Sequence, residues 1–340
     1  MLTILLFAIS SLYLTIKVQG QVSEANIDFE NIAEKIDEEE IARHLEFFSS
    51  LRSRVSGYSG FFEAAEYIVS KFKEYNVTPY GMDEEYYEYY NITVPMDLGS
   101  SIKLANGEVY DAYSLWPNYV NPSPYHSPAE GDLLVDVGYG EFKDYREDMS
   151  GKWVLMDFNS RWYFRIAMAL GAKGVIYIGR NETSRIEALQ KLYEVPVYFP
   201  RLYVEEDVGE KLRSLCKAEG KVKIWVNSDI EWQNIRVPNI VGFIQGIGPG
   251  KDETIVLSAF YDSWSIVPAL SPGATDALGI SVLLEAARVM GQNRPQRSLI
   301  ILALSGHWET LWGAREYIDR HFNSLGVKIK LFASLNLATD

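Results

Sequence analysis

Four side chains that can bind metals or move protons follow apolar segments in the C-terminal third of the sequence. They are Asp262, Asp276, His307 and Glu309. Carboxylates and imidazoles ligate zinc, and either group can act as a general base. In open α/β sheets, ligands bind beyond the carboxyl ends of the strands. The pattern therefore predicts a crevice where these side chains meet, together with the polar residues at 336–340.

Each of these residues also has an ordinary structural interpretation. Asp276 precedes a predicted helix, where a carboxylate caps free N–H groups. A lone histidine such as His307 is usually just hydrogen-bonded, and Asp262 suits a turn. The indication of function therefore comes from the set of residues and not from any one of them.

An alternation of strands and helices positions these residues. Apolar runs predict strands at 254–261, 298–304 and 329–337, and helical spacing predicts helices at 280–290 and 310–322. Strands that are apolar on both faces and separated by helices are typical of a parallel sheet covered by helices. We therefore expect an α/β fold with a mostly parallel sheet flanked by helices.

The middle of the chain, between residues 98 and 230, has a different character. Short strands such as 175–178 and 195–199 alternate with turns, and the Asn106–Gly107 pair indicates a hairpin. Amphipathic helices are expected before this stretch. The sequence therefore predicts a β-rich module set between helical segments.

The composition excludes several classes of protein. The 340 residues include 32 Lys and Arg against 46 Asp and Glu, and the formal net charge of −14 argues against a nucleic acid partner. Cys216 is the one cysteine, which excludes intramolecular disulfides, redox motifs and cysteine-based zinc sites. The length suggests two domains and is sufficient to bury an ordinary core.

The first residues predict export. Residues 1–16 are uncharged and mostly apolar, but they are fewer than the ~20 that a membrane-spanning helix needs. We expect a signal peptide over residues 1–20, cleaved after Gly20, with an uncleaved N-terminal anchor as the alternative. The protein would then be secreted or extracytoplasmic. Glycosylation sequons at Asn76, Asn91 and Asn181 are compatible with that location.

A series of motifs resembles the M28 family of zinc aminopeptidases and carboxypeptidases. The motifs are Ser53–Arg54 with the helix after it, 256–264 (VLSAFYDSW), 272–276 (PGATD), 283–290 (LLEAARVM) and 304–315 (LSGHWETLWGAR). The stretch 151–178, where GKWVLM leads to a helix and then GAKGVIYI, resembles a protease-associated (PA) domain. M28 members with this insertion include aminopeptidases and catalytically silent relatives such as the transferrin receptor.

The resemblance implies a domain organisation. Residues 21–109 plus 235–340 would form a zinc exopeptidase-like domain, and residues 110–234 a PA-like domain inserted into it. The sheet of the family normally continues past the point where this sequence stops. We therefore expect the peptidase-like domain to be incomplete at its C-terminus.

The sequence departs from the zinc ligands that the resemblance implies. The first ligand is a histidine in a His-x-Asp motif, and Phe260 stands in its place. The aspartate of that motif, which orients the ligand, is retained as Asp262. The aspartate that bridges the two metals is retained as Asp276.

The remaining ligands of the family are also altered. The consecutive Glu-Glu pair, general base and then ligand, falls on His307 and Trp308, with a carboxylate one place later at Glu309. The next aspartate falls on Asn336, or on Ala338 if the register slips by two. The last histidine would lie beyond the end of the sequence.

These departures favour a protein without a dinuclear zinc centre. Each zinc ion needs about four N, O or S ligands, and neither a phenyl ring nor an indole N–H supplies a lone pair. We therefore expect a non-catalytic homologue that acts in binding or scaffolding and has no zinc cofactor. The alternative is a zinc-dependent aminopeptidase with a rearranged mononuclear site built from Asp276, His307 and Glu309. Asp262 and His307 are the candidate catalytic residues in that case.

The expected partners follow from the same interpretation. A protein or peptide ligand suits a silent peptidase-like crevice. The apolar strand at 329–337 would lie inside the sheet, and without further chain to cover it one sheet edge would stay open. Self-association through that edge is therefore a further expectation.

Overall fold

The computed structural model describes residues 32–325 and 329–337. The expected signal peptide at 1–20, Ala338 and the end of the chain lie outside the described residues. Residues 37–340 form one compact unit. Among the described residues, no helix is long and apolar enough to cross a membrane.

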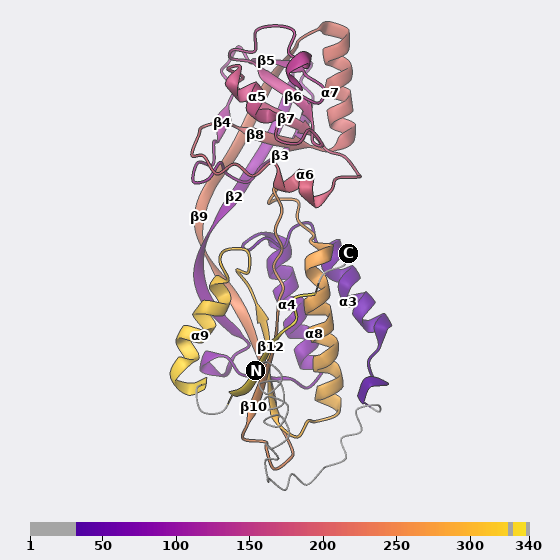
Figure 1. Cartoon of the computed structure of the whole chain (residues 1–340), viewed down its shortest axis with the longest axis vertical. Coiled ribbons are helices and arrows are strands. Elements are labelled where there is room, and N and C mark those ends of the chain that lie inside the picture. The colour runs from indigo at the N-terminus through magenta and orange to yellow at the C-terminus, as the bar shows by residue number, and fades with distance from the viewer. Residues whose placement is uncertain (1–31, 326–328, 338–340) are drawn as a thin grey trace, which may run out of the picture. The chain divides into compact units, whose positions relative to one another are not determined.

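The helices lie in three groups along the chain (Figure 1). Of the helices bounded within the described residues, two precede the first long strand, three accompany the middle strands and two alternate with the last strands. Their bounds are α3 (Glu38–Ser50), α4 (Ser59–Glu74), α5 (Phe164–Ala169), α6 (Arg185–Leu189), α7 (Glu206–Glu219), α8 (Ala274–Gln292) and α9 (Trp312–Leu325).

The strands of the described residues belong to one mixed sheet. The main path has the order β12-β10-β11-β9-β2-β3-β8-β7-β6-β5, and β1 and β4 pair with β9 beside it. Their bounds are β1 (Thr78–Pro79), β2 (Tyr87–Leu104), β3 (Val109–Ser114), β4 (Tyr125–His126), β5 (Asp132–Asp136), β6 (Trp153–Asp157), β7 (Gly174–Ile178), β8 (Arg201–Val204), β9 (Val222–Ile244), β10 (Thr254–Phe260), β11 (Ser298–Leu304) and β12 (Ile329–Ser334).

The sheet near the C-terminus has the predicted α/β character. Strand β10 pairs in parallel with both β11 and β12, and Phe260 lies opposite Leu304 at the ends of the first pair. The sheet as a whole is less parallel than expected, because β9 runs antiparallel to β11 and to β2.

The prediction that 329–337 is an interior strand is wrong for the described residues. Strand β12 ends at Ser334 and lies at the edge of the sheet path, next to β10. Its Leu331 and Phe332 side chains are exposed. An apolar run of this length has no periodicity that separates an edge strand from a central one. Self-association through this edge stays a prediction.

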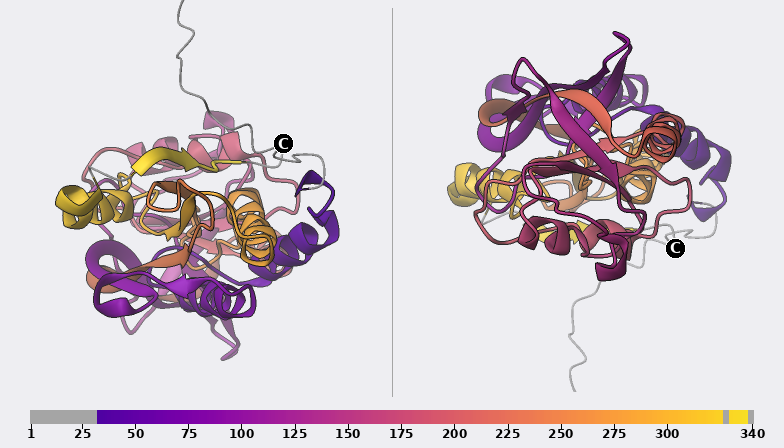
Figure 2. Two further views of the ribbon diagram at one scale, coloured as in Figure 1. Left: turned by 90° about the horizontal axis from the view of Figure 1, so that it is seen from below. Right: turned by 90° about the horizontal axis from the view of Figure 1, so that it is seen from above.

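Successive apolar residues of β11 point to opposite faces of this part of the sheet. Ile301 and Ala303 of β11 pack in one core with α4 and α8, whereas Ile300 and Leu302 pack in another with Tyr317 of α9. Figures 1 and 2 show α8 beside β10, and α9 on the opposite side of these strands. Successive side chains of a strand point to opposite faces, so both faces are covered by helices.

Local sequence explains where several helices begin and end. Asp37 caps α3, since its Oδ1 accepts hydrogen bonds from the N–H groups of Glu39 and Glu40 at 2.9 and 3.4 Å. Helix α7 ends at Gly220, whose φ of 80° suits a residue without a Cβ atom. Gly273 precedes α8 with φ 61°, and a Cβ there would lie 2.4 Å from the Cβ of Ser263.

The middle of the chain forms its own parallel strands, β5 to β8. Helix α7 packs on one face and α5 on the other, with Trp153 in the first core and Val154 in the second. The expected strand at 195–199 is absent from the described structure, because the chain becomes a strand only at Arg201.

Strands β2 and β9 connect this middle region with the rest of the unit. They pair from Tyr87↔Ile240 to Leu104↔Ile224, and Pro95 lies opposite Trp232 within the ladder. The boundary expected at 234 therefore falls inside a paired strand. The division into a peptidase-like and a PA-like domain stays a prediction.

Candidate functional site

The parallel strands bring two of the predicted loops together. Strand β10 ends at Phe260 and β11 at Leu304, so both chains continue from the same edge of the sheet. The N–H of His307 donates a hydrogen bond of 2.9 Å to Oδ2 of Asp262. Asp262 is completely buried. We keep the name crevice, from the sequence prediction, for Asp262, Asp276, His307, Trp308 and Glu309 taken together.

Two carboxyl groups in the crevice hold protons more tightly than usual. Burial raises the pKa of Asp262 well above its ordinary value, and the charge of Glu309 raises it further. Burial also raises the pKa of Glu309. Within the part of the chain that the structure describes, Oδ1 of Asp262 and Oε2 of Glu309 are buried without a hydrogen-bond partner. Such a pair can retain a proton near neutral pH or accept hydrogen bonds from a cationic ligand.

Asp276 lies in the first turn of α8 and not ahead of the helix as expected, and Gly273 occupies the N-cap position without a side-chain cap. Its Oδ2 is 3.5 Å from the backbone N–H of Trp264, so it contacts the loop that leaves β10. Burial raises the pKa of Asp276, while the positive charges of Arg54 and Arg185 act in the opposite direction. Asp276 therefore lies in the first turn of α8, within reach of the positive charges of Arg54 and Arg185.

An aromatic stack occupies the place of the expected first ligand. The rings of Phe260 and His307 are parallel, with centroids 3.9 Å apart and 15° between their planes. Trp308 is edge-on to both rings, at 6.2 and 5.1 Å. Partial burial lowers the pKa of His307, which favours the neutral imidazole.

Arg54 binds the backbone beside Asp262 and Asp276, and sequence reasoning missed it as a site residue. Its completely buried guanidinium donates hydrogen bonds to the carbonyl oxygens of Tyr261, Phe48 and Gly273 at 2.9, 2.8 and 3.0 Å, and to that of Pro272. Burial lowers its pKa to about 10, which still leaves it charged at neutral pH.

A row of tryptophans extends from the crevice. Ring centroids lie 6.4 Å apart for Trp308 and Trp264, 5.9 Å for Trp264 and Trp116, and 6.4 Å for Trp116 and Trp232. All four side chains are partly exposed. Arg185 of α6 places its guanidinium 5.8 Å from the ring centre of Trp308. Sequence reasoning missed this row, because its members come from four separate segments.

The other predicted positions lie apart from this arrangement. Asn336 is exposed in the segment after β12, and Ala338 is outside the described residues. The sequon residues Asn76, Asn91 and Asn181 are all exposed, which leaves them sterically accessible.

The described side chains do not fit the zinc centre that the family resemblance implies. No group of three or more His, Cys, Asp or Glu residues in the described ranges is arranged to hold a metal ion. Phe260 offers no lone pair, and the indole N–H of Trp308 is only a donor. Zinc binding by Asp276, His307 and Glu309 therefore stays a prediction, and we derive no catalytic step through a metal.

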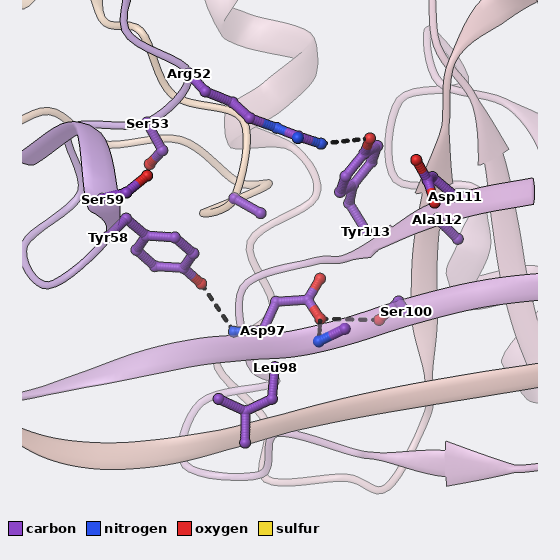
Figure 3. A pocket seen from close by; sticks show the side chains of 12 residues that line it. Arg52, Ser53, Tyr58, Ser59, Asp97, Leu98, Ser100, Asp111, Ala112 and Tyr113 are labelled. Carbon is purple, nitrogen blue, oxygen red and sulfur yellow. Dashed lines mark hydrogen bonds between the residues drawn. The ribbon is translucent and has the colours of Figure 1, made fainter.

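A separate hollow of about 360 Å³ lies beside the loop that joins β10 to α8 (Figure 3). Arg52 crosses it and donates a 2.6 Å hydrogen bond to the hydroxyl of Tyr113. On the facing wall, the hydroxyl of Tyr58 accepts a 2.8 Å hydrogen bond from the backbone N–H of Asp97. The Asp97 carboxylate accepts from Ser100 at 3.0 Å, which secures the irregular turn in β2.

Comparison with known families agrees with this fold. The model of peptidase family M28 matches residues 239–339, the segment that supplies Asp262, Asp276 and Glu309. The chain is M28 peptidase-like. A solved zinc aminopeptidase from Bacillus subtilis has the same fold, with a TM-score of 0.55 and 20% identity over 87% of this chain and 69% of that one.

Two curated relatives match this M28 peptidase-like chain in part. Aminopeptidase YwaD of Bacillus subtilis is 30% identical over 190 residues, 55% of this chain and 39% of that protein. The BOS complex subunit NCLN of Gallus gallus is 40% identical over 120 residues, 29% of this chain and 21% of that protein. The matched segments thus span well under half of these relatives.

Proposed function

We propose that this M28 peptidase-like protein binds a peptide in the crevice and does not hydrolyse it through a two-zinc centre. The observation that carries the proposal is the Phe260–His307 stack at the carboxyl end of β10. A phenyl ring stands where the resemblance implies a metal-binding imidazole, and it covers the face of the nearest histidine. The ligand class rests on the similarity to aminopeptidase YwaD, whose name implies a peptide substrate.

A binding role also agrees with the other residues of the crevice. Partly exposed indole rings offer apolar contacts to a peptide. One relative, NCLN, is named as a subunit of the BOS complex, which indicates a role in an assembly for that protein. By analogy we propose binding or scaffolding for this chain.

A second candidate is a zinc-dependent aminopeptidase with one metal. The name of aminopeptidase YwaD favours it. In this case Asp276, His307 and Glu309 would hold the ion after a rearrangement of the aromatic stack.

The setting of the protein is part of the proposal. We propose export, directed by residues 1–20, and a PA-like module over residues 110–234. The exposed sequon at Asn181 would place a glycan on that module.

Hydrolysis of amino-acyl coumarin amides separates the two candidates. We expect no turnover above background with or without added zinc, because the family's ligand positions are altered. The proposal is wrong if zinc restores turnover after chelation and Glu309→Gln abolishes it. Glu316→Gln is the matched control, since that glutamate lies on α9 and pairs with Arg320.

A further inference from the structure

The long strand β2 has an open edge over the first part of its length. It pairs with β9 on one side, but β3 covers its other side only from Ser100 to Lys103. No further strand of the described residues pairs with β2. Figure 1 shows β2 and β9 as the long pair that connects the middle region with the rest of the unit. The edge from Tyr87 to Pro95 is therefore available to another strand.

Hydrogen bonds near the two ends of this edge show which backbone groups point outward. Tyr86 faces β9, because its carbonyl oxygen accepts a 2.8 Å hydrogen bond from the N–H of Val241. In an antiparallel pair this orientation alternates along the strand, so the odd-numbered residues of this part of β2 face away from β9. The carbonyl oxygen of Tyr89 accordingly accepts from a side chain of α9 at 2.8 Å. That of Pro95 accepts from the hydroxyl of Tyr58 at 3.1 Å.

Asn91 and Thr93 lie between these two anchored positions. Both residues are exposed, and their outward N–H and C=O groups have no hydrogen-bond partner in the part of the chain that the structure describes. Such a row of unpaired groups is a template on which an extended peptide adds as a further strand. Pro95 fits this edge, because proline has no N–H and within sheets is confined mainly to edge strands.

A hollow of about 370 Å³ lies at the start of the same edge. Tyr87 and Tyr89 line it from the strand. The turn at 82–85 lines it from the other side and carries the carboxylates of Asp83 and Glu85. Both carboxylates are exposed, and neither forms an ion pair with another described residue. The hollow thus offers two accessible negative charges next to the open edge.

The other charged groups of this hollow are engaged within the chain. Arg236 lies over the ring of Tyr89, 4.3 Å from its centre. Arg320 donates to the carbonyl oxygen of Tyr89 and pairs with a glutamate of its own helix. The side chain of Glu88 is buried and pairs with His321 at 2.8 Å. The formal net charge of −14 also attracts cations, so a basic side chain suits the hollow better than an acidic one.

We propose that an extended peptide with a basic side chain adds as a strand to β2 at Asn91 and Thr93, and that its basic side chain enters the hollow. Backbone hydrogen bonds supply the affinity, and the carboxylates of Asp83 and Glu85 supply the selectivity. This surface is separate from the crevice, so the inference goes beyond the proposed function. Asn91 is also a glycosylation candidate, and a glycan there would cover the edge.

Calorimetry with three peptides tests the proposal on the full chain produced without glycans. The peptides are acetyl-Thr-Val-Lys-Val-Thr-amide, its counterpart with glutamate in place of lysine, and the lysine peptide with every backbone nitrogen methylated. We expect the lysine peptide to bind most tightly. The glutamate peptide should bind about 5- to 30-fold more weakly, because two carboxylates repel it. The methylated peptide should bind about 10-fold more weakly or less, since it donates no backbone hydrogen bond.

Thr93→Pro and Thr93→Ala are a matched pair of variants. Proline removes the outward N–H and is tolerated at an edge, as Pro95 is, whereas alanine retains the N–H. Thr93→Pro should weaken binding of the lysine peptide about 10-fold, and Thr93→Ala should change it less than about 2-fold. Asp83→Asn should weaken it about 2- to 5-fold. Asparagine is tolerated at the φ of 64° that Asp83 adopts.

Amide hydrogen exchange, measured by NMR on the unmodified chain, reports the contact directly. The lysine peptide should slow exchange at Asn91 and Thr93, because their N–H groups become hydrogen-bonded. Exchange at Ile92 should stay as it is, because its N–H already faces β9. This measurement remains decisive if Thr93→Pro does not fold.

Several results would overturn the proposal. One is equal affinity of folded Thr93→Pro and Thr93→Ala for the lysine peptide, and another is equal affinity of the parent chain for the lysine and glutamate peptides. Absence of binding at millimolar lysine peptide would also overturn it. Slower exchange at Asn91 and Thr93 with rising protein concentration alone would assign the edge to a second copy of the chain. None of these results bears on the crevice, which the coumarin amides test separately.

Discussion

Replacing Arg54 by methionine should lower the free energy of unfolding by about 3–5 kcal/mol. The guanidinium is completely buried and donates to four backbone carbonyls, which join the end of α3 to the loops on either side of Asp262 and Asp276. Methionine fills much of the space but leaves these acceptors without that donor. Urea unfolding followed by tryptophan fluorescence measures the change.

Arg52→Met is the matched control for this prediction. Arg52 is exposed, and its guanidinium donates one hydrogen bond, to the hydroxyl of Tyr113. Its loss should cost less than about 1 kcal/mol. Equal midpoints for the two variants would contradict the assignment of Arg54 as the support of the crevice.

Acidification from pH 6.5 to 4 should destabilise the protein by about 3 kcal/mol through His44 alone. The ring is buried in α3 and lies between the hydroxyls of Tyr67 and Tyr75, at 2.7 and 3.2 Å. Burial lowers the pKa of His44 to about 4 in the folded chain. The unfolded chain binds the proton near pH 6.5, so the free energy of unfolding rises with pH across this window.

The measurement compares the free energy of unfolding at several pH values for two variants. His44→Gln should flatten the pH dependence between 6.5 and 4, although it also lowers stability at every pH. His126→Gln should retain the slope, because that side chain is exposed and its pair with Asp229 lies at the surface. The same slope in His44→Gln as in the parent chain would show that other groups cause the acid sensitivity.

Local patterns predicted the C-terminal fold well. Continuous apolar runs marked β10 and β11, and helical spacing marked α8, although α8 begins at Ala274 and not at residue 280. The long strand β9 has no continuous apolar run over most of its length. Its middle alternates polar residues and contains Pro238, so its extended form depends on pairing with β2.

The site was predictable only in part. The shared edge of parallel strands predicts that Asp262 and His307 meet, and they do. The stack of Phe260 on His307 depends on side-chain packing that no spacing rule describes. Arg54 and Arg185 reach the crevice from segments far away in the sequence, and a single sequence gives no sign of such contacts.

The zinc content of the purified chain tests the central claim most directly. The protein is equilibrated with micromolar zinc, passed over a desalting column and analysed by mass spectrometry for metal per chain. Our account predicts far less than one zinc per chain, with the same value in Asp276→Asn. One zinc per chain in the parent protein, lost in Asp276→Asn and in Glu309→Gln, would contradict the account and establish a metal centre in the crevice.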